Sequence, residues 1–181
     1  MIELKTIPLD GSLVTTDDAL AYFDSLEPVS LDFMLGKWKG GEIPTNHPMD
    51  GLLEATNWYG KEFVSQDEVF PLVLSNRPGE TYKIVPYGSL INLGMKFPVF
   101  KSLAMKKVNG LVTKLVQTKN SQARIRMTEL RGKISATMIY DGLPINDVFR
   151  KINDNVVMGL MDYKGKERPY FFYLEREEEN E

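Results

Sequence analysis

Residues 123–142, ARIRMTELRGKISATMIYDG, carry the pattern that decides the fold. Apolar and polar side chains alternate on both sides of Gly132, which is typical of two antiparallel strands joined by a tight turn. Similar runs follow at residues 145–152, 156–162 and 170–175, with turn residues between them. The C-terminal third therefore predicts a β-meander with strands of about 5–8 residues.

The earlier part of the chain predicts short helices and further strands. Residues 16–26 predict a helix that Thr15 or Thr16 caps and that Pro28 ends. A second short helix is expected to begin at residues 45–48, where Pro48 fits the first helical position. Strands are expected at residues 31–42, 58–64, 69–74 and 82–85, and residues 90–116 predict a short helix or irregular cover followed by a strand near 111–116.

A long open meander would leave unpaired strand edges, and closure into a barrel removes them. Gly36 and Gly40 flank Trp38 at period two, and glycine at these positions permits the curvature that a small barrel needs. We therefore expect a mainly β fold, an antiparallel lipocalin-like barrel of about 8–10 strands with two or three short helices. The whole chain, residues 1–181, is predicted to be one barrel domain, with an N-terminal half (1–65), a C-terminal meander half (120–175) and an acidic tail (176–181).

The composition excludes several classes of protein. The chain has no cysteine, which excludes disulfides, thiolate metal sites and cysteine nucleophiles. It has no signal-peptide pattern at the N-terminus and no apolar run of about 20 residues, so we expect a cytoplasmic protein. The single histidine, His47, lies beside Pro48 at a predicted helix start, where a capping or packing role is expected. No metal and no cofactor are predicted.

Charge is distributed unevenly along the chain. The net charge is −3, yet residues 81–128 hold nine lysines and arginines and no acidic residue. This stretch is either a solvated face or a positive field that favours an anionic ligand or surface. Weak contact of residues 96–107 with an anionic membrane is one expectation, while the acidic character of the whole chain argues against nucleic acid. The oligomeric state does not follow from the sequence.

A barrel of this size suggests that its interior binds a small hydrophobic molecule, a lipid or fatty acid with an anionic head. Two alternatives are open. One is a small-molecule enzyme that uses Asp141 or Asp147 with His47 or Lys61, and the other is a structural or interaction protein with a filled core. The predicted ligand-binding residues are Trp38, Trp58, Tyr59, Lys61, Arg126, Met127, Met138, Tyr140, Phe149 and Met158, and a candidate polar site comprises His47, Asp141, Asp147 and Arg150.

The sequence GKWKG at residues 36–40 resembles the GXWXG-domain family of bacterial and fungal proteins, and residues 45–61, TNHPMDGLLEATNWYGK, continue the likeness. Residues 123–150 and the sequence GLMD at 159–162 resemble the domain of unknown function that usually follows GXWXG. This resemblance implies an architecture more than an activity. More loosely, Gly-x-Trp on an early strand is similar to lipocalins, fatty-acid-binding proteins and nitrobindins, which implies a calyx for a lipid or fatty acid. Nitrobindins take their haem ligand from near the C-terminus, where this chain has no histidine.

Overall fold

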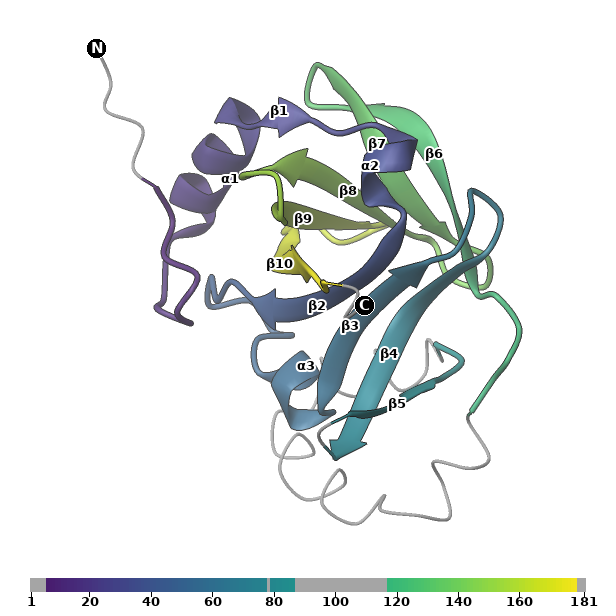
Figure 1. The fold of residues 1–181 in the computed structure, drawn as a ribbon. Coiled ribbons are helices and arrows are strands. Elements are labelled where there is room, and N and C mark those ends of the chain that lie inside the picture. Colours follow the sequence, from purple (N-terminus) through teal and green to yellow (C-terminus); the bar gives the residue numbers. More distant parts are fainter. Residues whose placement is uncertain (1–5, 78, 87–116, 179–181) are drawn as a thin grey trace.

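The computed structural model describes residues 6–77, 79–86 and 117–178, and the elements expected at 90–116 lie outside these residues (Figure 1). Eight antiparallel strands close into a barrel, as predicted, because each pairs with the next and the last pairs with the first. They are β2 (Gly36–Glu42), β3 (Trp58–Phe63), β4 (Val69–Arg77), β6 (Ala123–Leu130), β7 (Lys133–Tyr140), β8 (Ile145–Lys151), β9 (Val156–Tyr163) and β10 (Tyr170–Arg176). Two short strands pair beside them, β1 (Glu27–Pro28) on β8 and β5 (Glu80–Lys83) on β4.

Three short helices accompany the barrel, and a hydroxyl side chain caps the start of two of them. The helix α1 (Thr16–Ser25) forms where predicted, and the Thr15 hydroxyl accepts the Asp18 N–H at 3.0 Å. The helix α2 (Leu31–Met34) replaces the first part of a predicted strand, because the Ser30 hydroxyl accepts the Phe33 N–H and starts a helical turn. The helix α3 (Leu52–Ala55) begins after Pro48 rather than at it. At the other end of the chain, β10 extends to Arg176, so the predicted acidic tail begins inside a strand.

Apolar side chains form two clusters, one on each side of the barrel wall. The interior cluster contains Trp38, Phe149 and Phe172, while the exterior cluster lies between α1 and the barrel and includes Phe23 and Phe171. Neighbouring residues of β8, β9 and β10 face opposite clusters because side chains alternate along a strand. Both faces of these strands are therefore apolar beneath α1.

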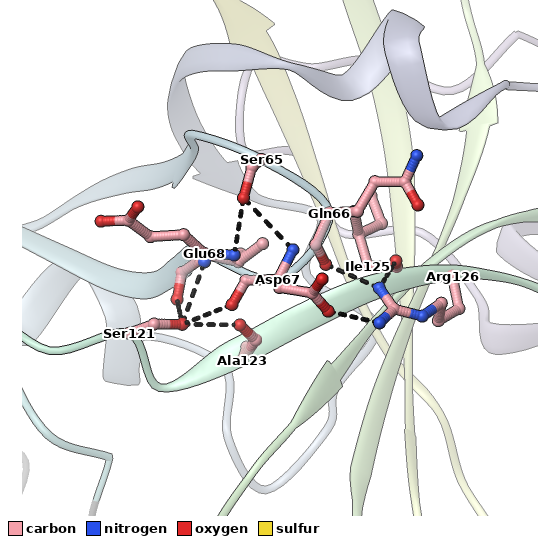
Figure 2. A network of polar contacts seen from close by, with 9 residues as sticks. Ser65, Gln66, Asp67, Glu68, Ser121, Ala123, Ile125 and Arg126 are labelled. Carbon is pink, nitrogen blue, oxygen red and sulfur yellow. Dashed lines mark hydrogen bonds and ion pairs between the residues drawn. The ribbon is translucent and has the colours of Figure 1, made fainter.

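The seam between β4 and β6 is held mainly by side chains (Figure 2). Among the described residues it has one ladder pair, Val69 with Ala123. The Ser121 hydroxyl accepts the Val69 N–H at 3.1 Å and donates to the Ala123 carbonyl at 2.8 Å. The Arg126 guanidinium donates to the Gln66 carbonyl at 2.8 Å and forms an ion pair with Asp67. These bonds tie the turn after β3 to β6.

Candidate functional site

An open pocket of about 390 Å³ lies against β2, β3 and β4. Its volume falls within the range of small-molecule sites. Three consecutive residues at the start of β3 form one side, and the neighbouring strands supply the remainder. The lining residues are Lys39, Gly40, Asn57, Trp58, Tyr59, Ser75 and Arg77.

Trp58 forms the inner wall of this pocket. A Cβ atom at Gly40 would lie 2.1 Å from the Trp58 ring, so the ring occupies the space that a side chain on β2 would fill. Asn57 precedes it with φ of +53°, a conformation that asparagine tolerates. The β3–β4 register shifts on both sides of Gly60, which turns this part of β3 away from a regular ladder. Trp58 is 8% exposed and meets Phe172 edge-on at 5.9 Å.

The outer wall of the pocket combines an aromatic ring with two cations. The Tyr59 hydroxyl donates to the Glu177 carboxylate at 2.8 Å, and partial burial, with help from Glu177, raises the pKa of Tyr59. Lys39 and Arg77 are exposed. Neither forms an ion pair with any residue in the described part of the chain. Two aromatic rings and two cationic side chains without an ion pair among the described residues therefore share one pocket.

A buried ion pair lies behind Trp58, inside the barrel. Lys61 Nζ is 2.8 Å from Asp147 Oδ2, and the two side chains are 4% and 2% exposed. The ammonium also donates to the Pro71 carbonyl at 3.3 Å and lies 5.0–5.8 Å from three ring centroids, those of Phe172, Trp58 and Tyr140. Burial raises the pKa of Asp147, and Lys61 opposes this only in part. Burial and the charge of Asp147 raise the pKa of Tyr140 well above its usual value.

Six of the predicted ligand-binding residues line the interior. Trp38 is fully buried there, and its indole N–H donates to the Met34 carbonyl at 2.8 Å. Phe149 packs edge-on against Phe63 at 5.7 Å and Phe172 at 6.2 Å. Aromatic side chains thus occupy much of the space around the ion pair. The six are Trp38, Trp58, Lys61, Met138, Tyr140 and Phe149.

The other four predicted ligand-binding residues do not line the barrel interior. Met158 packs in the exterior cluster beneath α1, so it does not line the interior as expected. Val157 faces inward instead, because side chains alternate along the strand, and a side chain at Gly159 would meet the interior ring of Phe172. Met127 is 43% exposed, and Arg126 binds the turn after β3. Tyr59 belongs to the outer pocket.

The four residues of the candidate polar site do not gather at one place. His47 lies in the loop before α3, where its Nδ1 accepts the Met49 N–H at 3.1 Å and its ring lies 5.5 Å from Tyr170. Asp141 is exposed in the turn after β7. Arg150 lies on the exterior face, 5.1 Å from the Phe23 ring, and donates to the carbonyls at the β6–β7 turn. Only Asp147 meets one of its proposed enzymatic partners, Lys61.

Sequence reasoning missed the two cations of the pocket. Lys39 is the fourth residue of the GKWKG sequence, one place before the glycine beneath Trp58. Lys39 alternates with the buried Trp38 and so lies on the outer face of β2, but no local pattern connects it with Arg77 of β4. No group of three potential metal ligands occurs within the described ranges. No helix there has the length and apolar character needed to cross a membrane.

The fold and the pocket define a class of protein, a closed eight-stranded barrel with an aromatic and cationic pocket beside its Gly-x-Trp-x-Gly strand. Residues 21–79 match the GXWXG protein family, and residues 121–176 match a domain of unknown function, DUF4334. The crystal structure of a protein from Thermomonospora curvata is similar at 34% sequence identity and a TM-score of 0.68, over 93% of this chain and 91% of that one. The chain belongs to the GXWXG family, and DUF4334 is its C-terminal part. No curated protein matches it.

Proposed function

We propose that this protein binds a small hydrophobic molecule with an anionic head, of the fatty-acid or lipid type, at the pocket beside Trp58. The pocket itself carries the proposal, because it sets Trp58 and Tyr59 beside Lys39 and Arg77. The rings offer apolar surface, and a guanidinium can bind a carboxylate or phosphate in bidentate fashion. An amphiphile offers an apolar chain to the rings and an anionic head to the cations.

Apolar contact and the two cations are both expected to contribute to the affinity. Removing apolar surface from water contributes roughly 25 cal/mol per Å². Exposed cations contribute on the order of 0.2–1 kcal/mol each, and they also act on orientation and specificity. The anionic head group is therefore expected to change the affinity measurably.

Titration calorimetry with decanoate and its neutral counterpart decanol tests the proposal. Decanoate is expected to bind more tightly than decanol, and the difference should shrink as salt is added. Lys39→Gln and Arg77→Gln should each lower the affinity for decanoate by about twofold to fivefold.

Two matched variants serve as controls. Lys37→Gln removes a cation from the same outward face of β2, and Arg124→Gln removes an exposed arginine from another strand, β6. Both should leave decanoate affinity unchanged. The proposal fails if decanoate does not bind. It also fails if the control variants lower the affinity for decanoate as much as the pocket variants do.

A further inference from the structure

The C-terminal end of the described chain brings a carboxylate to the pocket. Tyr59 lines the pocket, and its hydroxyl donates to the Glu177 carboxylate at 2.8 Å. Tyr59 belongs to β3 and Glu177 follows β10, while β2 lies between these two strands in the sheet. The contact therefore spans the outer face of β2, the strand that supplies Lys39 to the pocket.

Neighbouring contacts hold Glu177 in place. Its own N–H donates to the Lys37 carbonyl at 2.9 Å, so pairing with β2 continues past the end of β10. The preceding Arg176 guanidinium donates to the Leu35 carbonyl at 2.9 Å and lies 4.2 Å from the centre of the Trp38 ring. Because side chains alternate along a strand, Arg176 points inward and Glu177 points outward. The Glu177 carboxylate is therefore fixed beside Tyr59.

A second carboxylate lies beside a cation of the pocket. Glu175 is directly opposite Lys39 in the β10–β2 ladder, and both side chains are exposed. The Cβ atoms of such a pair are about 4.5–5.5 Å apart, and opposite charges at these positions attract each other. One carboxylate of the chain end thus contacts a lining residue, and another lies next to a lining cation.

The Glu177 side chain and a fatty-acid head carry the same chemical group, a carboxylate. A tyrosine hydroxyl has one hydrogen to donate, so Tyr59 can donate to only one of the two carboxylates at a time. A group that the chain itself holds at a site competes there at a high effective concentration. A ligand head that binds at this hydroxyl must therefore displace Glu177.

We propose that Glu177 is an internal competitor of the ligand's anionic head, and that a bound head takes the Tyr59 hydroxyl in its place. This inference rests on the proposed function and adds two residues that set how strongly the pocket prefers an anion. A carboxylate accepts a stronger hydrogen bond than a neutral head does. A neutral amphiphile therefore binds against the rings and leaves the contact between Tyr59 and Glu177 intact.

Calorimetry of the variant Glu177→Gln with decanoate and decanol tests the competition. The substitution removes the competing charge and keeps the size of the side chain. The affinity for decanoate should rise by about twofold to fivefold, while the affinity for decanol stays the same. Glu178→Gln is the matched control, because it removes the same charge from the next residue, which is also exposed. It should leave the affinity for decanoate unchanged.

Tyr59→Phe separates the contact with the hydroxyl from the general effect of a negative charge. It removes the hydroxyl and keeps the ring that lines the pocket. Coupling between two residues appears as a departure from additivity when both are changed. In the Tyr59→Phe chain, Glu177→Gln should therefore change the affinity for decanoate no more than Glu178→Gln does.

The outcomes separate this inference from the proposed function. If decanoate binds and Glu177→Gln acts like Glu178→Gln, the inference is overturned and the proposed function stands. If Glu177→Gln lowers the affinity for decanoate, Glu177 supports the site instead of competing for it, and the inference is again overturned. A gain in affinity that survives in Tyr59→Phe overturns it as well. If decanoate binds none of these chains, both proposals fail.

Discussion

At the scale of single residues, the GKWKG sequence ties barrel geometry to the pocket. Gly36 has φ of +110°, which residues with a side chain rarely adopt. Trp38 fills the interior, and Gly40 leaves the space that the Trp58 ring occupies. Each glycine and the tryptophan of the family motif therefore has a structural reason. The second glycine, Gly40, shapes the wall of the proposed site.

Gly40→Ala tests the role of that last glycine. The new Cβ would lie 2.1 Å from the Trp58 ring, so the ring and its strand must shift. We expect the free energy of unfolding, measured in urea, to fall by about 1–3 kcal/mol. Gly142→Ala is the matched control, because a Cβ there meets no atom within 4 Å, and it should change stability by about 0.5 kcal/mol or less. Equal effects of the two substitutions would contradict this explanation of the motif.

Asp147 should make stability depend on pH in a direction opposite to that of most ion-paired carboxylates. Burial raises the pKa of Asp147, so the folded chain holds this proton more tightly than the unfolded chain does. Its contribution to stability is therefore greatest below the unfolded pKa of about 3.9, and it is lost as pH rises through the folded pKa.

Urea unfolding at a series of pH values checks this, with Asp147→Asn as the reference. The unfolding free energy of the wild-type chain minus that of the variant should fall as pH rises from about 4 through the folded pKa. A difference that rises over the same interval would mean that attraction to Lys61 outweighs burial.

At the scale of elements, the seam between β4 and β6 has the shortest backbone ladder of the barrel wall among the described residues. A single ladder pair joins these strands in the described residues, and the Ser121 and Arg126 side chains supply further bonds (Figure 2). The other seams have three or more ladder pairs each. Local opening of the barrel is expected to begin where the backbone ladder is shortest.

Ser121→Ala should loosen this seam selectively. The Val69 N–H loses its hydroxyl acceptor, which should cost about 1–2 kcal/mol. Hydrogen exchange at the Val69 and Ile125 amides should accelerate, while amides of the β2–β10 seam should keep their rates. Uniform acceleration around the barrel would show that Ser121 acts on global stability instead.

Local patterns predicted some elements better than others. The alternation in residues 123–140 and the cap at Thr15 predicted β6, β7 and α1, since both signals are short-range. The helix α2 was missed because LDFML is apolar enough for a strand, although Ser30 and Gly36 mark its two ends. Met158 was assigned to the wrong face of β9. The helix α1 covers this strand from outside, so both of its faces are apolar, and the sequence pattern does not indicate which face points into the barrel.

At the scale of the whole molecule, closure brings together residues that no local pattern connects. Lys61 of β3 meets Asp147 of β8 across the interior, and Lys39 of β2 shares a pocket with Arg77 of β4. The sequence could nominate Trp58, Lys61 and Asp147 by residue type, but only the strand order determines which of them meet. The predicted membrane contact of residues 96–107 falls outside the described residues and stays a prediction.

The chain contains two tryptophans, and they form a built-in comparison for the account's central claim. Trp58 lines the pocket, whereas Trp38 is fully buried with its indole N–H bonded to the Met34 carbonyl. The most direct measurement is a titration of the ¹⁵N-labelled protein with decanoate, following both indole N–H resonances. A ligand site at Trp58 predicts a saturable shift of the Trp58 resonance while the Trp38 resonance stays in place. A shift of Trp38 alone, or no shift of either, would contradict a ligand site at Trp58.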